Sequence, residues 1–233
     1  MHGWIILDKP IGLGSTQAVA AVKRNLREAG FGKVKVGHGG TLDPLASGVL
    51  PIALGEATKL CGRMLDASKA YDFTIAFGTE TAGLDAEGEV VATSSHRPTI
   101  DGIEGVLPSF TGPIEQIPPA YSAIKIDGKR AYDRARAGEE VAMKARCVTI
   151  HSLGVFASLR ETEKGLFAPR RKEAKDVFDE LTLSADVSKG TYIRSLARDF
   201  ALALGTVGHV TMLRRTRAGP FDLKQAISLD KLN

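Results

Sequence analysis

The segment GHGGTLDPLASGVLP, residues 37–51, surrounds a single acidic side chain with four glycines and two prolines. Glycine permits a positive φ and lets the backbone approach neighbouring groups closely. Pro44 restricts Asp43 to extended backbone and prevents a helix from continuing through the segment. We therefore expect a loop that holds the Asp43 carboxylate in a fixed position ahead of a strand at residues 49–54, although the same residues would also suit an ordinary turn.

The composition is that of an ordinary globular protein, since 43% of the 233 residues are hydrophobic and 25% are charged. Thirty-one Lys and Arg against 27 Asp and Glu give a net charge of +4, which permits a polyanionic partner without requiring one. Basic residues gather in the segment 125–146 and at Arg214, Arg215 and Arg217. These side chains could contact phosphates or form a solvated face.

Cysteine usage and hydropathy limit the compartment. The two cysteines, Cys61 and Cys147, form no Cys-x-x-Cys motif, so the sequence indicates neither a disulfide scaffold nor a zinc site. The apolar run at residues 4–7 is too short for a signal peptide, and no later segment is long and apolar enough to span a membrane. The sequence therefore predicts a soluble cytoplasmic protein.

The N-terminal residues predict a strand at 4–7, then a glycine loop and a helix. Ser15 or Thr16 is expected to cap this helix, and Gly30 is expected to end it in the C′ position. A strand, a glycine loop and a helix can bind dinucleotides. That hypothesis fails here because Gln17 stands where the third glycine would be required.

Two further segments have a clear hydrophobic period. Residues 56–65 predict a helix that buries Leu60, Met64 and Leu65. Residues 71–77 alternate strictly between large apolar and smaller or polar side chains, which is typical of a half-buried strand.

The rest of the chain adds a short helix at 100–107 and strands at 148–155 and 181–187. Residues 83–88 predict a turn, whereas the polar, basic segment 161–175 has no pattern that we recognise.

A further helix is predicted from the apolar face that runs from Ile193 to Leu204, with Thr191 as its cap. Arg194 lies at its first turn, where a cation opposes the positive end of the helix dipole. We therefore expect an acidic partner for Arg194 elsewhere in the chain; the alternative is a solvated arginine.

Several segments together resemble the TruB family of tRNA pseudouridine synthases, and the resemblance covers roughly residues 3–221. The segments are KPIGLGS (9–15), the loop 37–51, KAY (69–71), QIPPAYSAIK (116–125), KGTYIRSLARD (189–199) and HVTMLRRTRAGPF (209–221). A modest departure is Thr79-Glu80-Thr81, where the family usually has Thr-Asp-Thr.

The resemblance implies a role for each matched site residue. Asp43 would be the nucleophile, Arg194 its ion-pair partner, and Tyr71 the ring that stacks on the target base and a candidate for proton transfer. The implied substrate-binding residues are His38, Tyr192, Leu213 and Lys9, the last in a motif that lies beside the active site and is mainly structural.

The resemblance also implies the fold and the reaction. The fold would be α+β, a pseudouridine synthase fold with a mixed, mostly antiparallel central sheet flanked by helices. Residues 1–221 would form the catalytic domain, including a basic RNA-gripping insertion at about 116–146, and residues 222–233 would form a short tail. Family members usually carry a further RNA-binding domain after this point, so the affinity for RNA is put in doubt.

The implied activity is isomerisation of a uridine in the T-loop of tRNA, position 55, to pseudouridine on a flipped-out base. The reaction has no net redox change, so neither a cofactor nor a metal is expected. The expected partner is the T-arm of tRNA, bound by a monomer.

Two other classes of function deserve comparison. A glycosidase would need two carboxylates that bracket the scissile bond, whereas only Asp43 has a special setting here. A catalytically inactive RNA-binding module would fit the basic segment. Retention of Asp43, Tyr71 and Arg194 in three separate motifs argues against that second alternative.

Overall fold

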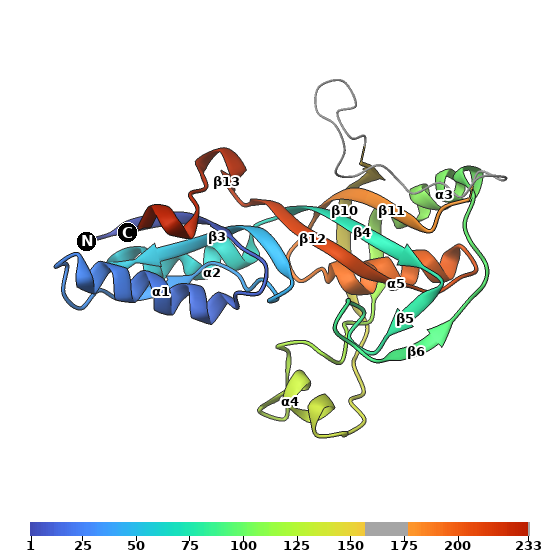
Figure 1. Ribbon diagram of the computed structural model, residues 1–233, viewed down its shortest axis with the longest axis horizontal. Coiled ribbons are helices and arrows are strands. Elements are labelled where there is room, and N and C mark those ends of the chain that lie inside the picture. Colours follow the sequence, from blue (N-terminus) through green and yellow to red (C-terminus); the bar gives the residue numbers. More distant parts are fainter. Residues whose placement is uncertain (157–176, 233) are drawn as a thin grey trace. The chain divides into compact units, whose positions relative to one another are not determined.

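The computed structural model describes residues 1–156 and 177–232, so the basic segment 161–175 lies outside the described residues. The chain divides into two compact units (Figure 1). The first unit contains Met1–Asp72, Asp186–Lys189 and Met212–Asn233, and the second contains Phe73–Ala185 and Gly190–Thr211. No helix in the described part of the chain is long and apolar enough to cross a membrane.

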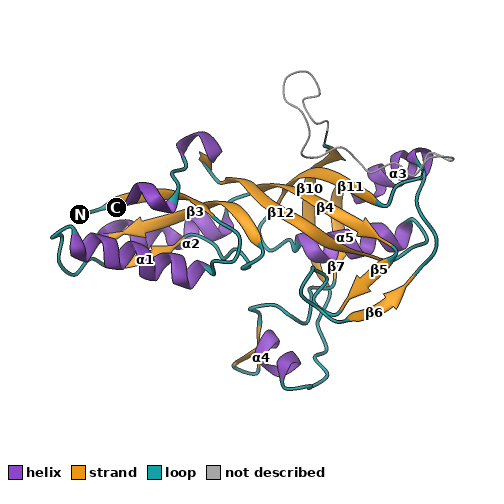
Figure 2. Ribbon diagram, in the orientation of Figure 1, coloured by secondary structure: helices purple, strands orange, loops and turns teal. Residues whose placement is uncertain are grey.

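The main sheet of the described chain has nine strands (Figure 2). They are β1 (Gly3–Lys9), β2 (Val36–His38), β3 (Ala46–Leu54), β4 (Lys69–Phe77), β7 (Gly112–Gln116), β10 (Arg146–Val155), β11 (Glu180–Val187), β12 (Gly208–Ala218) and β13 (Phe221–Asp222). Hydrogen-bonded neighbours follow the order β1-β3-β12-β4-β11-β10-β7, with β2 on β3 and β13 on β12.

The sheet is mixed, because β12 pairs with β3 in parallel whereas β1 and β2 pair with β3 antiparallel. The pairs β7–β10 and β12–β13 are also antiparallel. The expected α+β fold with a mixed, mostly antiparallel sheet is thus confirmed.

The described structure also contains α-helices, two small hairpins and 3₁₀ helices at Gly55–Leu60, Leu107–Phe110, Leu223–Gln225 and Leu229–Leu232. The α-helices are α1 (Ser15–Glu28), α2 (Cys61–Asp66), α3 (Ile100–Val106), α4 (Ala131–Arg136) and α5 (Ile193–Ala203). The hairpins pair β5 (Thr79–Thr81) with β6 (Val90–Thr93), and β8 (Lys125–Ile126) with β9 (Lys129–Arg130).

Both ends of α1 follow from local chemistry. Gly30 has φ +82° and its N–H donates to Arg27 O at 3.1 Å, while Phe31 N–H donates to Leu26 O at 3.0 Å. This is the Schellman pattern, so the C′ role predicted for Gly30 is confirmed. The predicted cap is wrong, because Gly14 is the N-cap and Ser15 already lies inside the helix.

The apolar core of the first unit forms between α1 and the middle strands of its sheet. Its members include Leu7, Val19, Val22, Leu50 and Ile52. Since β3 has a strand on each edge and a helix over it, its residues from Gly48 to Leu54 are all buried. A near-continuous apolar sequence is what such a central strand requires.

The helix predicted at 56–65 is wrong in part. A 3₁₀ helix, Gly55–Leu60, comes first and α2 begins only at Cys61. Because a 3₁₀ helix has three residues per turn, side chains spaced for an α-helix rotate away from the core. Met64 is buried as expected, whereas Leu60 and Leu65 are 44% and 51% exposed.

The last residues of the chain pack into the first unit. Ile227 N–H donates to Ile6 O and Asp8 N–H donates to Ile227 O, both at 2.8 Å. Leu223 and Ala226 pack on a small apolar cluster that contains Ile6. Ile227 therefore pairs with β1, and Leu223 and Ala226 cover the apolar cluster to which Ile6 of β1 belongs.

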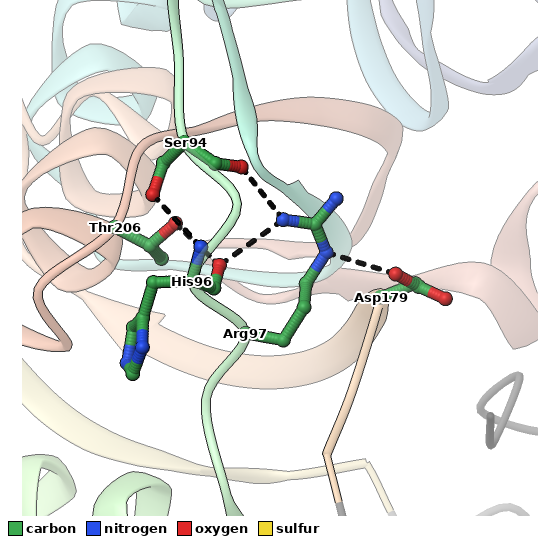
Figure 3. Close-up of polar contacts among 5 residues, drawn as sticks. All are labelled: Ser94, His96, Arg97, Asp179 and Thr206. Atoms are coloured by element: carbon green, nitrogen blue, oxygen red, sulfur yellow. Dashed lines mark hydrogen bonds and ion pairs between the residues drawn. The ribbon is translucent and has the colours of Figure 1, made fainter. Parts of the chain in front are cut away.

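In the second unit, the connection from β6 to α3 is anchored by a polar cluster. Arg97 Nε donates to Asp179 Oδ1 at 2.8 Å, and Arg97 Nη1 donates to the carbonyls of Ser94 and His96 at 2.8 and 3.1 Å. Figure 3 shows how these side chains lie. Thr206 Oγ1 donates to His96 O at 3.0 Å. The cluster ties this connection to the residue before β11 and to the segment after α5.

A substitution at Gly48 tests how closely β3 packs against β12. It has φ +102°, and a Cβ there would lie 2.2 Å from Arg215 O. We expect Gly48→Ala to lower the free energy of unfolding by about 3 kcal/mol or more, since a positive φ costs roughly 1–2 kcal/mol and overpacking about 1–3 kcal/mol.

Urea unfolding measures this loss, with Gly32→Ala as the matched control. Gly32 also has a positive φ, +65°, but no atom lies within 4 Å of an added Cβ. Equal losses in the two variants would contradict the steric account.

Candidate active site

Asp43 lies in the loop between β2 and β3, as the sequence predicts. The backbone of this loop is hydrogen-bonded at every carbonyl from residue 40 to residue 44, as the contacts below describe. The first is local, because Ala46 N–H donates to Asp43 O at 3.1 Å.

Lys9, the last residue of β1, holds the C-terminal side of the loop. Its side chain is 0% exposed, and Nζ donates to Leu13 O at 2.6 Å, Pro10 O at 2.8 Å and Pro44 O at 3.3 Å. This geometry favours a structural role for Lys9 over a direct contact with substrate.

Arg215, in β12, holds the N-terminal side of the same loop. Its side chain is 1% exposed. Nη2 donates to Gly40 O and Nη1 to Thr41 O, both at 3.2 Å, while Nε donates to Val49 O at 2.7 Å. The planar guanidinium thus joins two loop peptides to the strand that follows.

Ser15, the first residue of α1, forms further hydrogen bonds to this loop. Its buried hydroxyl donates to Leu42 O at 2.9 Å and accepts from Leu42 N–H at 2.8 Å. Since a residue on each side of Asp43 is thereby hydrogen-bonded to another element, long-range contacts fix the backbone of Asp43 in addition to the local bond of its own turn.

The charge of Arg215 also affects Lys9. Burial lowers the pKa of Lys9 to about 8, the Asp43 carboxylate opposes that shift, and Arg215 adds to it. The electrostatic effect of Asp43 on Lys9 means that the candidate nucleophile lies near a buried positive charge.

Tyr71 and Leu213 pack against apolar residues that include members of the 37–51 segment. Both are partly buried and pack against the cluster that contains Leu42 and Ala46. Leu213 is also the register partner of Ala46 in the parallel pairing of β12 with β3. Leu213 therefore lies at the start of β3, close to Asp43 in sequence, and Tyr71 packs against the same apolar cluster of the first unit.

His38 ends β2 and is the register partner of Ile52. Its Nδ1 is buried and has no hydrogen-bond partner among the described residues. Burial, followed by the charge of Arg215, lowers the pKa of His38 below its usual 6.5. A neutral imidazole is therefore expected at neutral pH, which suits a contact with a base better than a contact with a phosphate.

Arg194 lies in the second unit, in the first turn of α5, and is 6% exposed. Its Nη1 donates to Gly83 O at 2.7 Å and to Asp85 Oδ2 at 3.1 Å, while Nη2 donates to Tyr121 O at 2.9 Å. The acidic partner that the helix dipole requires is thus confirmed and includes Asp85. Pairing of Arg194 with Asp43 of the first unit stays a prediction.

Tyr192 is the N-cap residue of α5, so the prediction of Thr191 as the cap is off by one residue. The Arg146 guanidinium carbon lies 4.7 Å from the centroid of the Tyr192 ring. A cation at this distance favours a fixed ring orientation.

Each arginine of β12 has partners within the protein. Arg214 forms two hydrogen bonds with Asp8, at 2.8 and 3.1 Å, and Arg217 pairs with Asp186 at 2.5 Å. Arg215 is buried and cannot reach a phosphate, whereas the side chains of Arg214 and Arg217 are 35% and 31% exposed, so a phosphate contact by these two stays a prediction. The basic stretch 125–146 differs, since Arg130 and Arg136 both lie about 5.5 Å from the Tyr132 ring on an exposed hairpin and helix.

The first unit thus contains Lys9, His38, Asp43, Tyr71 and Leu213, and the second contains Tyr192 and Arg194. Sequence reasoning missed Arg215 and Asp85. Arg215 could have been found from period 2, since it shares a strand face with Leu213. Asp85 gave no signal beyond its place in an acidic turn. In the described part of the chain, no group of three or more His, Cys, Asp or Glu side chains could hold a metal ion.

Comparisons with known proteins give consistent results. A family model described as TruB family pseudouridylate synthase (N terminal domain) matches residues 27–193, and one described as tRNA pseudouridylate synthase B C-terminal domain matches residues 194–233. The chain is 64% identical over its whole length to tRNA pseudouridine synthase B of Novosphingobium aromaticivorans and 60% identical to that of Zymomonas mobilis subsp. mobilis. It spans 72% and 71% of those two proteins.

Among solved structures, the chain is similar to one in a Cbf5-Nop10-Gar1 complex, with a TM-score of 0.67 and 33% identity. That match covers 98% of this chain and 52% of the other, so the chain spans about half of that solved protein.

The Arg194–Asp85 pair gives the first prediction from this site. Arg194→Met should lower the free energy of unfolding by on the order of 3–5 kcal/mol, because it leaves the Asp85 carboxylate without its arginine partner. The side chains are only 7% and 20% exposed, so solvent can do little to compensate.

Chemical denaturation of Arg194→Met, Asp85→Asn and the double variant measures the coupling. Lys189→Met is the control, since it breaks an ion pair with Asp66 whose members are 64% and 67% exposed, and should cost at most about 1 kcal/mol. Losses that simply add in the double variant would contradict the pairing.

The second prediction concerns pH. Because the pKa of His38 is lower in the folded chain than in the unfolded chain, the unfolded chain binds more protons as pH falls through about 6.5. The free energy of unfolding should therefore fall as the pH is lowered, because His38 stays neutral in the folded chain and is protonated in the unfolded chain. Urea unfolding between about pH 7.5 and 5 should show a shallower pH dependence for His38→Gln than for the parent.

His151→Gln, at an exposed position in β10, controls for the loss of one imidazole. A parental slope in His38→Gln would rule out this source of acid sensitivity.

Proposed function

The chain belongs to the TruB family of pseudouridylate synthases, and from that premise we propose that it converts a T-loop uridine of tRNA to pseudouridine. The observation that carries the proposal is the hydrogen-bonded Asp43 loop, in a chain 64% identical over its whole length to a tRNA pseudouridine synthase B. A rigid loop is what a nucleophile requires, since positioning supplies much of the rate.

The reaction is an isomerisation. The bond from ribose C1′ to uracil N1 breaks, the uracil turns, and a bond from C1′ to C5 forms. The proton on C5 is lost and N1 gains one, so atoms and electrons balance without a cofactor. An ionised Asp43 is the proposed nucleophile, attacking either the uracil ring or the ribose.

Arg194 is the proposed partner of Asp43. A guanidinium favours the charged form of a nearby carboxylate and orients it through two parallel N–H groups. The contacts of Arg194 with Asp85, Gly83 O and Tyr121 O support this role, because they fix the guanidinium from within the second unit.

The target base must leave the stack, so the proposed site needs flat apolar surfaces. We assign that role to Tyr71, Tyr192 and Leu213, with Tyr71 also a candidate for the C5 proton. His38 is proposed to contact the displaced nucleotide, and its neutral form favours stacking or hydrogen bonding over ion pairing. Lys9 acts on the loop and not on the substrate.

Binding of the T-arm is assigned to the basic stretch within residues 116–146 of the proposed catalytic domain, 1–221. Arg130 and Arg136 are cations that can bind phosphates, and the Tyr132 ring between them can stack on a base. The protein is proposed to act as a monomer on cytoplasmic tRNA.

Incubation with a tRNA transcript, followed by mapping of pseudouridine, tests the function. Product should appear at one T-loop uridine without added metal or nucleotide, and Asp43→Asn should reduce turnover by about 10³-fold or more while the fold persists.

Asp66→Asn is the control, because its carboxylate is exposed in the same unit. Turnover of Asp43→Asn within tenfold of the parent would refute the nucleophile assignment, and modification confined to ribosomal RNA would refute the substrate.

A further inference from the structure

The side-chain amide of Gln116 forms hydrogen bonds with the backbone of Tyr192, as a neighbouring strand would. Gln116 is the last residue of β7 and is 1% exposed. Tyr192 N–H donates to its Oε1 at 2.8 Å, and its Nε2 donates to Tyr192 O at 3.1 Å. One amide therefore bonds to both polar groups of the Tyr192 backbone, immediately before α5 begins, and Tyr192 O also accepts from Leu196 N–H at 3.0 Å.

The ring of Tyr192 is held from the strand next to Gln116. Arg146, the cross-strand partner of Gln116 in β10, has its guanidinium carbon 4.7 Å from the centroid of that ring. Arg146 Nη2 also donates to Gly190 O. The backbone and the ring of Tyr192 thus depend on two neighbouring residues of one strand pair.

Ile117, the residue after Gln116, binds two side chains in the first turns of α5. Ile117 O accepts from Ser195 Oγ at 2.8 Å and from Arg198 Nη2 at 3.1 Å. Arg194 donates to Tyr121 O within the same segment. The end of β7 and the residues that follow therefore fix the start of α5.

We propose that Gln116 is a positioning residue for the reaction. Its amide sets the backbone of Tyr192 and, through the first turn of α5, the guanidinium of Arg194. The inference rests on the proposed function for the roles of Tyr192 and Arg194. Gln116 itself is the buried end of a strand, although it begins the segment that the sequence assigns to RNA gripping.

Gln116→Leu keeps the size of the side chain and removes both hydrogen bonds. We expect kcat to fall by about 10- to 100-fold, because a displacement of roughly 1 Å at reacting groups can cost 10²-fold. KM for tRNA should stay within about threefold, since phosphate contacts elsewhere supply most RNA affinity.

Gln116→Glu separates positioning from simple stability. A protonated carboxyl both donates and accepts, as the amide does, whereas a carboxylate only accepts. Buried carboxyl groups titrate above their usual range. The kcat of Gln116→Glu relative to the parent should therefore fall as pH rises from about 5 to 8.

Thr99→Val is the matched control in the same unit, because it removes the hydroxyl that caps α3 and none of the hydrogen bonds at the start of α5. It should lower stability and leave kcat within about twofold of the parent. Stability is measured at each pH, so that kcat is compared only where every variant is folded.

Hydrogen exchange of residues 190–195 gives a readout that does not need activity. The Tyr192 amide should exchange faster in Gln116→Leu than in the parent and Thr99→Val. If the parent makes no pseudouridine, the proposed function fails while this measurement still decides whether the amide fixes Tyr192.

Unchanged exchange at Tyr192, a Gln116→Leu kcat within twofold of the parent, or a pH-independent ratio for Gln116→Glu would each overturn the positioning role. Faster exchange together with a lower kcat and a near-parental KM would support it.

Discussion

Two buried cations, Lys9 and Arg215, bind the peptide carbonyls on either side of Asp43. They come from β1 and β12, the two strands that flank β3, and they act on the loop that leads into β3. Burying a charge is costly unless hydrogen bonds replace water, and three carbonyls do so for each cation. The position of Asp43 is therefore determined by the sheet and not by the local turn alone.

The strand that carries Lys9 depends in turn on the end of the chain. Ile227 forms hydrogen bonds on both sides of Leu7, to Ile6 O and from Asp8 N–H, and Leu229 packs against the main core of the first unit. An edge strand with unpaired backbone groups would be prone to slip or fray. Ile227 pairs with β1 around Leu7, so the segment after β13 supports the loop of Asp43 from a distance.

Much of the fold was predictable where one local rule dominated. Alternation identified β4 and β11, and Gly30 ended α1 as its φ requires. The failures occurred where two local solutions compete. A 3₁₀ turn replaced the first part of the helix at 56–65 and exposed Leu60, while the caps of α1 and α5 moved by one residue. Helix ends are decided by small energy differences that tertiary contacts can reverse.

The sequence by itself determined that Asp43 lies in a constrained loop, because glycine and proline restrict the backbone wherever they occur. It also determined that Arg194 begins a helix and needs an acid, because the helix dipole is a local property. Only the tertiary structure decided that Asp85 is that acid, that Arg215 is buried on the loop, and that Gln116 binds Tyr192. Hydrogen bonds between residues far apart in sequence leave no periodic signal, since any polar side chain can serve once strand pairing has brought its partner within reach.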